Sequence, residues 1–190
     1  MVTKKAKAKE WFTLIAPKMF HEKEIGRTPS DDPAKLIGRR VTLNMIELTN
    51  DFEKFYLKVS FRVKKIEGNK AYTEFDSSEC MRDYISRMIL RRIRRIDAVQ
   101  DIPLKDGSKI RVKCLAIVPR RVKSSIQIKI RNKIKDLIKE EVEKLSIEDF
   151  VNKLLNDEIK RRVIREVRGT YPIRNFEIRK TELLVTSKTA

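Results

Sequence analysis

The chain has 190 residues, enough to bury a hydrophobic core without disulfides or metals, and its hydrophobic fraction of 41% excludes global disorder. Its formal net charge is +18, and self-repulsion at that charge is unfavourable unless a polyanion offsets it. The excess is uneven, because residues 81–135 carry a net +13 whereas residues 136–158 carry a net −5. A uniformly solvated surface of lysine and glutamate would intersperse the signs, so the pattern favours a nucleic-acid partner.

The N-terminus is expected to be a basic arm. Residues 1–10 are rich in lysine and alanine with almost nothing to bury, which predicts a segment that orders only when it meets a partner. The apolar and aromatic segment 11–20 should dock on the folded body. Residues 26–33 (GRTPSDDP) contain two prolines, an aspartate pair and a glycine, a composition typical of a loop.

Two strands and a hairpin are expected next. Residues 40–48 alternate apolar and polar side chains and then shift phase at Ile46, which predicts a β-bulge. Residues 55–63 (FYLKVSFRV) alternate throughout, so one face should be buried and the other wet. Residues 67–69 (EGN) have the composition of a hairpin turn that leads into a returning strand at 70–75.

Residues 77–98 are expected to form one long helix. Apolar residues recur there at three- and four-residue steps, namely Met81, Ile85, Met88, Ile89, Ile93 and Ile96. Arginines occupy much of the rest, so this helix would cover the strands with its apolar stripe and expose an arginine face. A turn at 105–109 (KDGSK) and a strand at 110–118 should follow.

The last third is expected to be mainly helical. Residues 126–145 place isoleucine, leucine and valine on one helical stripe, and Ser146 begins a second helix in a capping-box-like arrangement. A third helix should run from Asp157 to Gly169, and residues 171–185 form a final extended segment.

These elements predict an α+β fold of five or six strands with three or four helices, antiparallel by the hairpin signals. One-sided strands can close into a barrel or remain an open sheet, and periodicity does not distinguish the two. The expected organisation is a flexible arm at 1–10, a single domain at 11–185 and a short tail at 186–190.

The chain lacks the residue patterns of most enzymes. It has one histidine, five glycines and no nucleotide-binding, zinc-protease or serine-hydrolase motif, so we expect no enzyme, no cofactor, no metal and no small-molecule substrate. A metal-dependent nuclease built from scattered carboxylates remains an alternative. The two cysteines should be buried thiols of a cytoplasmic protein, since neither a secretory signal nor an apolar run of membrane-spanning length is visible.

Two basic segments can face a polyanion. Residues 88–96 (MILRRIRRI) contain four arginines, whose forked guanidinium groups fit phosphate oxygens. Residues 118–135 (VPRRVKSSIQIKIRNKIK) hold seven basic residues and no acidic one, and should project as a loop or arm. The alternatives are a solvated face or a membrane-surface helix for the first segment, and packing against the acidic residues 136–158 for the second. No base-reading motif occurs, so we expect recognition of backbone and shape, which suits structured RNA.

Five stretches resemble one known family: KEWFTLIAPKMF (9–20), IGRT (25–28), LIGRRVTLNMIELTND (36–51), TEFDSSECMRDYISRMI (73–89) and YPIRNFEIRKTELL (171–184). Their order and spacing are similar, from end to end, to the archaeal–eukaryotic small-subunit ribosomal protein family S3Ae, also called S1e. The chain stops soon after the last stretch, whereas eukaryotic relatives continue, which favours an archaeal-type member.

The resemblance implies a non-catalytic component of the 30S subunit, with a β-barrel-like core flanked by helices. It implies a position on the platform near the messenger RNA exit side, in contact with small-subunit rRNA and neighbouring platform proteins, in a cytoplasmic, ribosome-associated molecule. The rival hypothesis is a free-standing RNA-binding module, such as an RNA chaperone, or a DNA architectural protein.

The family offers no active site to carry over, so the candidate RNA contacts come from charge alone. They are Lys4, Lys5, Lys7, Lys9, Lys18, Arg39, Arg40, Arg91, Arg92, Arg94, Arg95, Arg120, Arg121, Lys123, Ser124, Lys129, Arg131, Lys133 and Lys135.

Overall fold

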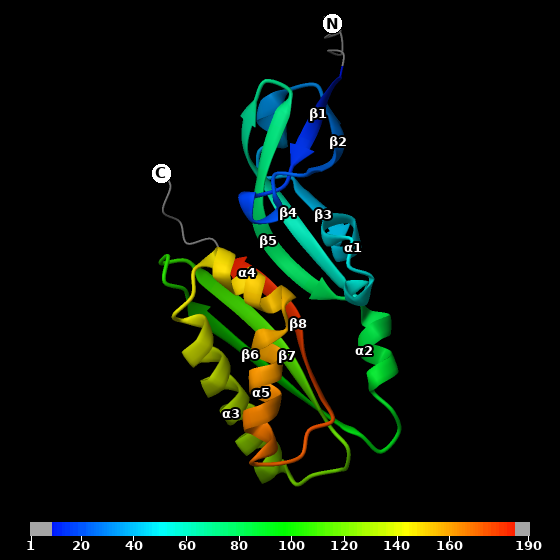
Figure 1. The fold of residues 1–190 in the computed structure, drawn as a ribbon, viewed down its shortest axis with the longest axis vertical. Helices are drawn as coiled ribbons and strands as arrows, with labels where there is room; N and C mark the ends of the chain where they lie inside the picture. The colour runs from blue at the N-terminus through cyan, green and yellow to red at the C-terminus, as the bar shows by residue number, and fades with distance from the viewer. Residues whose placement is uncertain (1–8, 185–190) are drawn as a thin grey trace, which may run out of the picture. The chain divides into compact units, whose positions relative to one another are not determined.

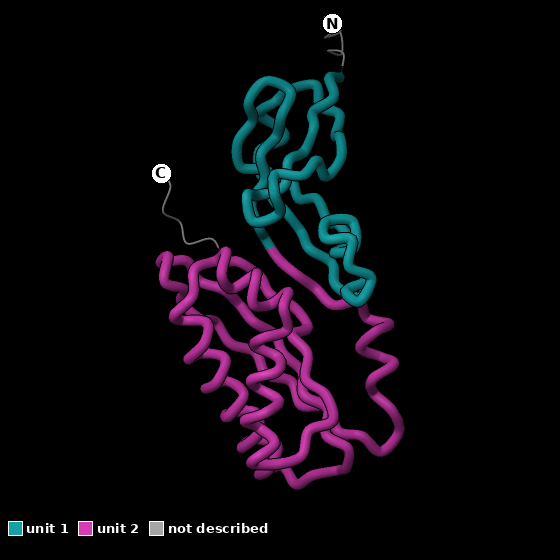
Figure 2. Tube along the Cα trace, in the orientation of Figure 1, with its two compact units in different colours: residues 1–76 teal, residues 77–190 magenta. Residues whose placement is uncertain are grey.

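A computed structural model of the chain describes residues 9–184. The chain divides into two compact units, residues 1–76 and residues 77–190, drawn in teal and magenta in Figure 2. Most of the expected N-terminal arm and the expected tail at 186–190 lie outside the described residues.

The first unit consists mainly of β-strands. They are β1 (Glu10–Ile15), β2 (Glu24–Ser30), β3 (Arg40–Asn44), β4 (Leu57–Glu67) and the first part of β5 (Lys70–Cys80), with one short helix, α1 (Met45–Thr49). Three 3-10 turns complete it, at Lys18–Phe20, Pro33–Leu36 and Phe52–Lys54. β1 and β2 are antiparallel, as are β3 and β4.

The alternation of β4 produces the core of this unit. Leu57, Val59, Phe61 and Val63 are buried, and the residues between them are exposed or half-buried. The ring of Phe20 packs edge-on against Phe61 with 5.5 Å between ring centroids, so the segment 11–20 docks as expected. The predicted turn at 67–69 joins β4 to β5, and Gly68 adopts a positive φ of 57° there.

Two expectations for the first unit are wrong. Residues 26–33 are not one loop, because β2 runs to Ser30 and a 3-10 turn begins at Pro33. The phase shift at Ile46 is not a bulge: the strand ends at Asn44 and α1 begins. A change from two-residue to helical spacing has the same signature as a bulge over so few residues.

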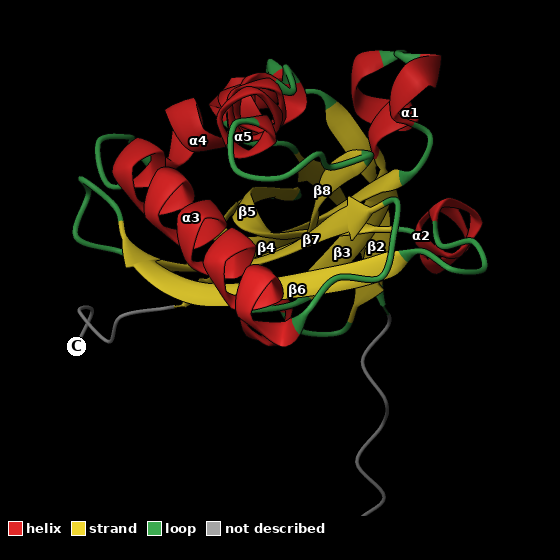
Figure 3. Cartoon of the chain, turned by 90° about the horizontal axis from the view of Figure 1, so that it is seen from below, coloured by secondary structure: helices red, strands yellow, loops and turns green. Residues whose placement is uncertain are grey.

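The second unit is a sheet covered by helices. After the end of β5 come α2 (Arg82–Met88), β6 (Arg94–Pro103), β7 (Lys109–Val118), α3 (Ser124–Val142), α4 (Ile147–Leu155), α5 (Glu158–Arg168) and β8 (Asn175–Leu184). β6, β7 and β8 are antiparallel neighbours, and Figures 1 and 3 show α3, α4 and α5 on one face of them.

The helical predictions for the last third are confirmed. The stripe of α3 is buried at Ile130, Ile134, Leu137, Ile138 and Val142. Ser146 Oγ accepts a hydrogen bond from the backbone N–H of Asp149 at 3.2 Å, which begins α4 as a capping box does. Asp157 and Gly169 flank α5.

The long helix expected over residues 77–98 does not form. β5 continues to Cys80, α2 covers only seven residues, and β6 begins at Arg94. Ile96, Ala98 and Ile102 are buried on the helix-covered face of β6, a two-residue spacing that pairing with β7 satisfies. Pairing with a strand that lies later in the chain therefore overrides the local helical spacing.

The described strands form an open, mixed sheet and not a closed barrel. The strand order is β2-β1-β5-β8-β7-β6, and β4 pairs with both β3 and β5 off this path. β5 pairs with β8 antiparallel but with β1 in parallel. The expectation of a wholly antiparallel sheet is therefore wrong.

Candidate nucleic-acid interface

Two connections meet at one end of the β6–β7 hairpin. Arg94 at the start of β6 lies opposite Val118 at the end of β7, so residues 89–93 and residues 119–123 lie at the same end. A hollow of about 500 Å³ there is lined by Arg92, Pro119, Arg120 and Arg121, and we call it the arginine hollow. The structure thus brings together three candidates from the two basic segments.

A neutral side chain fixes one wall of the arginine hollow. Gln127 Nε2 donates to the carbonyl of Val122 at 2.9 Å, and Gln127 Oε1 accepts from Arg94 Nε at 3.2 Å. The connection 119–123 is thereby tied to the beginning of β6. Its backbone is held while its guanidinium groups are left available for a ligand.

The cations in and next to the arginine hollow have no counter-charge in the described part of the chain. Among residues 9–184, Arg92, Arg120, Arg121 and Lys123 make no ion pair and no side-chain hydrogen bond, and all four are exposed. The first turn of α3 contains no acidic residue, so the positive end of its helix dipole adds to the same field. Guanidinium groups gathered in this way repel one another unless an anion binds between them, and phosphate oxygens match their geometry.

The four arginines of residues 88–96 do not share a helix face. Arg91 and Arg92 lie in the turn before β6, where Arg92 has a positive φ of 67°, and both are exposed. Arg94 and Arg95 are consecutive in a strand and therefore point to opposite faces. Arg95 is held by Asp97, with 2.7 Å between Arg95 Nη2 and Asp97 Oδ1.

The second basic segment is a loop only as far as Lys123, so the expected projecting arm is wrong beyond that point. Ser124 and Lys129 are exposed on α3. Arg131 Nε instead donates to the carbonyl of Asp97 at 2.9 Å, and Lys133 Nζ donates to Thr170 Oγ1 at 2.9 Å. Lys135 is half-buried.

The candidate RNA contacts in the first unit differ in whether their side chains are free or bonded inside the protein. Lys9 and Lys18 are exposed, whereas Lys4, Lys5 and Lys7 lie outside the described residues. Arg39 Nη1 donates to Thr28 Oγ1 and, at 3.4 Å, to the carbonyl of Pro29. Arg40 Nε lies 2.9 Å from Oδ2 of the buried Asp76, so both arginines support the fold as well as offering charge.

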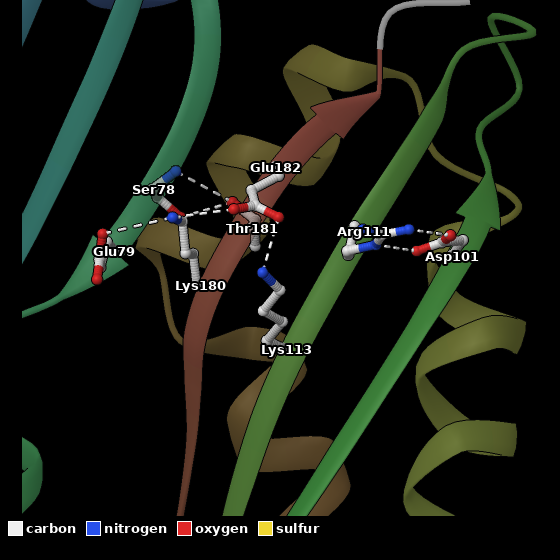
Figure 4. A network of polar contacts seen from close by, with 8 residues as sticks. All are labelled: Ser78, Glu79, Asp101, Arg111, Lys113, Lys180, Thr181 and Glu182. Atoms are coloured by element: carbon white, nitrogen blue, oxygen red, sulfur yellow. Dashed lines mark hydrogen bonds and ion pairs between the residues drawn. The ribbon is translucent and has the colours of Figure 1, made fainter.

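Charges on the face of the second unit opposite the helices are largely paired with one another. Arg111 binds Asp101 through two hydrogen bonds of 2.6 and 2.7 Å (Figure 4). Glu182 lies 2.8 Å from Lys113 and 2.9 Å from Lys180. These two hydrogen bonds hold the pKa of Glu182 down at about 2. The surplus positive charge of residues 81–135 therefore does not lie on this ladder.

Part of the acidic stretch 136–158 is paired with basic residues of the helical layer. Glu141 pairs with Lys153 of α4 at 3.6 Å and with Arg162 of α5. They do not neutralise the arginine hollow, whose residues make no ion pair in the part of the chain that the structure describes.

Two arginines that sequence reasoning did not select line another hollow in the second unit. Arg82 of α2 and Arg179 of β8 meet there with Arg95. No linear pattern could have joined them, because only the folded sheet brings their elements together.

Other chemistry is limited in residues 9–184. They contain no group of histidine, cysteine or carboxylate side chains that could hold a metal, and none of their helices is long and apolar enough to cross a bilayer. Cys80 and Cys114 are free and buried, as expected. Burial raises the pKa of Cys80 to about 12, so this thiol is neutral near pH 7.

Comparison with known proteins supports the resemblance seen in the sequence. The model of the Ribosomal S3Ae family matches residues 1–187. The chain belongs to the ribosomal S3Ae family. The match includes both units, so family membership covers the arginine hollow as well as the strands of the first unit.

Curated archaeal relatives extend this S3Ae match. A protein of Methanopyrus kandleri named small ribosomal subunit protein eS1 is 40% identical over 188 residues, covering 97% of this chain and 89% of the relative. Proteins of the same name from Archaeoglobus fulgidus and Sulfurisphaera tokodaii are 37% and 34% identical, covering 93% and 95% of this chain and 84% and 93% of the relatives.

Proposed function

We propose that this S3Ae protein is a structural constituent of the small ribosomal subunit that binds rRNA through its phosphate backbone and shape. The observation that carries the proposal is the arginine hollow, where three guanidinium groups from two connections gather without a counter-charge from residues 9–184. The family match and the names of the relatives support the ribosomal setting. The proposal assigns the chain no catalytic step.

The principal rRNA contacts in this proposal are the exposed cations of the second unit that make no ion pair or side-chain hydrogen bond among the described residues. Arg91, Arg92, Arg120, Arg121 and Lys123 bind phosphates, and Ser124 and Lys129 extend the contact along α3. Arg94, Arg95, Arg131, Lys133 and Lys135 contribute mainly by fixing the structure, because they are partly buried or hydrogen-bonded inside the protein.

The remaining candidates make a second region of contact. Lys9, Lys18, Arg39 and Arg40 of the first unit bind rRNA together with Lys4, Lys5 and Lys7 of the basic arm at 1–10, which orders on RNA. Residues 11–185 act as one rRNA-binding body, followed by the short tail at 186–190.

The family resemblance supports a specific position in the ribosome. We place the protein on the platform near the messenger RNA exit side, beside other platform proteins, in the cytoplasm.

Co-sedimentation with small subunits tests the proposal against a free-standing RNA-binding module or chaperone. A structural constituent stays with the subunit through a high-salt wash and co-purifies in about equal amounts with other small-subunit proteins. A chaperone binds naked rRNA but is removed by the wash, and that result would overturn the structural assignment.

A further inference from the structure

A second hollow lies within the second unit, and only one of its lining residues, Arg95, belongs to the two basic segments. Its volume is about 350 Å³, and three of its lining residues are arginines from three different elements: Arg82 of α2, Arg95 of β6 and Arg179 of β8. The last residues of β5 and one side of α2 complete it with Glu79, Cys80, Ile85 and Ser86. We call it the sheet hollow.

A register shift in the sheet places Arg179 in this hollow. Lys113 of β7 lies opposite Lys180, and the next residue of β7, Cys114, lies opposite Ile178. Arg179 therefore has no partner residue on β7, as in a β-bulge, and bulges re-aim side chains. The local backbone irregularity is thus used to direct one cation into the hollow.

The guanidinium of Arg179 is incompletely satisfied. Its Nε is buried and has no hydrogen-bond partner among the described residues. Arg179 and Arg82 also make no ion pair within residues 9–184. A buried N–H without an acceptor destabilises the folded state. Arg179 as a whole is half-buried and lines the hollow, so its guanidinium group stays within reach of an anion from outside the chain.

The other groups of the sheet hollow leave it positively charged. The carboxylate of Glu79 faces Lys180, with 3.7 Å between Oε2 and Nζ. Asp97 binds Arg95 from one side only, through a single carboxylate oxygen. The thiol of Cys80 is neutral and donates to the carbonyl of Ile178 at 3.2 Å. Arg82 and Arg179 thus have no counter-charge among the described residues, whereas Arg95 is paired with Asp97 and Glu79 with Lys180.

From this geometry we infer that the sheet hollow binds a phosphate group, which rRNA supplies if the proposed function holds. A phosphate offers several oxygens for forked donors and carries the negative charge that would neutralise Arg82 and Arg179, the two arginines without an ion pair among the described residues. A carboxylate of a neighbouring protein offers only two oxygens and a single negative charge, fewer than the forked donors and the two positive charges of Arg82 and Arg179 call for. The site would give the protein a phosphate contact on the sheet in addition to the one at the arginine hollow.

The test compares two double variants of the full chain in binding to small-subunit rRNA. Arg82→Gln with Arg179→Gln removes two cations of the sheet hollow and leaves Arg95 to hold Asp97. Lys105→Gln with Lys109→Gln removes two exposed lysines that make no ion pair among the described residues and lie at the turn end of the β6–β7 hairpin. Both lower the net charge equally, so general electrostatics cancels between them.

We expect the sheet-hollow variant to lose about tenfold or more in affinity and to lower the salt dependence by about two phosphate contacts. The lysine control should change much less.

Thermal melting shows whether the variant still folds. Arg179→Gln should melt at the same temperature or higher, because it removes an unsatisfied buried donor. If the parent protein binds rRNA and the two double variants bind equally well, the sheet hollow is not a phosphate site and the proposed function stands. If the parent protein does not bind rRNA at all, the proposed function itself fails.

Two further arms identify the source of the ligand. Inorganic phosphate at constant ionic strength should stabilise the parent protein more than the sheet-hollow variant. If it does so while rRNA affinity is unchanged by the variant, the hollow takes a free anion and the rRNA assignment is overturned.

Ser86→Cys offers an exposed thiol for a photoreactive probe, since both native cysteines are buried. In reconstituted subunits the probe should crosslink to rRNA, and crosslinking only to a neighbouring protein would overturn the inference.

Discussion

Lys160 of α5 places its Nζ 2.5 Å from Oε1 of Glu177, whose side chain is only 4% exposed. The hydroxyl of Tyr84 in α2 donates to the same oxygen at 3.0 Å. One carboxylate therefore ties two helices to β8, the strand that carries Arg179. Burial raises the pKa of Glu177, and its hydrogen bond from Lys160 only partly opposes this.

Replacing Lys160 with methionine should destabilise the second unit. The change leaves the buried carboxylate of Glu177 without its cation, and breaking such a pair costs about 3 kcal/mol or more of unfolding free energy. Lys144→Met is the control, because Lys144 is exposed and makes no ion pair in the described part of the chain. Equal melting of the two variants would show that the buried pair does not hold the unit together.

The pH dependence of the Lys160→Met variant follows from the same pair. Without Lys160, the pKa of Glu177 in the folded protein should rise further above its unfolded value. A raised folded pKa favours folding below the unfolded pKa, and this contribution is lost as pH rises through the folded pKa. Chemical denaturation should therefore show a larger deficit, relative to the parent protein, at pH 8 than at pH 5. A deficit independent of pH would contradict this assignment.

Glu182 should show the opposite dependence. Its pKa is lowered to about 2, first by the hydrogen bond from Lys113 and then by that from Lys180. Its stabilising contribution is complete above the unfolded pKa near 4.5 and is lost as pH falls toward 2. Because the side chain is 28% exposed and water screens the pairs, we expect about 1 kcal/mol.

Glu182→Gln tests this contribution through denaturation at pH 6 and pH 2.5. The parent protein should lose about 1 kcal/mol more than the variant over that interval. Identical losses would mean that the ion pairs drawn in Figure 4 do not stabilise the fold.

Two alanine substitutions distinguish the observed strand from the helix expected over residues 77–98. Ile96 is 1% exposed on β6, so Ile96→Ala should lower the unfolding free energy by about 2 to 4 kcal/mol. Ile93 is only half-buried in the turn before the strand, so Ile93→Ala should cost less than half of that. A continuous helix would bury both on one stripe, and equal losses would support it.

Sequence patterns predicted those helices and strands whose buried face follows from the hydrophobic spacing within the segment itself. The alternation predicted over residues 55–63 is buried from Leu57 to Val63, whereas Phe55 lies before the strand and is 46% exposed. The stripe of Ile130, Ile134 and Ile138 is buried as expected.

Residues 77–98 contain apolar residues at both the two-residue spacing of a strand and the three- to four-residue spacing of a helix. Pairing of β6 with β7, which lies later in the chain, favours the strand. The barrel-like core was implied by the family resemblance, and the described strands form an open sheet instead. Alternation could not decide this, because closure depends on which strands are edges.

The candidate interface was predicted in part for similar reasons. Charge runs located Arg92, Arg120 and Arg121, but only the hairpin register places them at one hollow. The same runs included Arg131 and Lys133, whose hydrogen bonds inside the protein depend on the packing of α3. They omitted Arg82 and Arg179, because Arg82 is followed by Asp83 and Arg179 lies between Glu177 and Glu182, so neither belongs to a run of basic residues.

Reversing the charges of the connection 119–123 should weaken rRNA binding without unfolding the protein. Changing Arg120, Arg121 and Lys123 to glutamate removes three phosphate contacts and should lower the slope of log affinity against log salt by about 2 to 3. These side chains are exposed and unpaired among the described residues, so the melting temperature should stay nearly constant.

A matched triple variant controls for net charge. Lys105, Lys109 and Lys144 are exposed, make no ion pair within residues 9–184 and lie at or next to the turn end of the β6–β7 hairpin. Their reversal to glutamate should affect binding much less. Equal weakening by both triples would mean that total charge, and not the arginine hollow, determines the affinity.

The most direct test is the affinity of the intact protein for small-subunit rRNA as a function of salt. Six or more phosphate contacts predict a fall of about a thousandfold or more between roughly 50 and 200 mM monovalent salt. Tight binding at the lower concentration with that steep decline is the result we predict. Absence of binding at about 50 mM, or an affinity that salt leaves unchanged, would contradict recognition of the rRNA backbone.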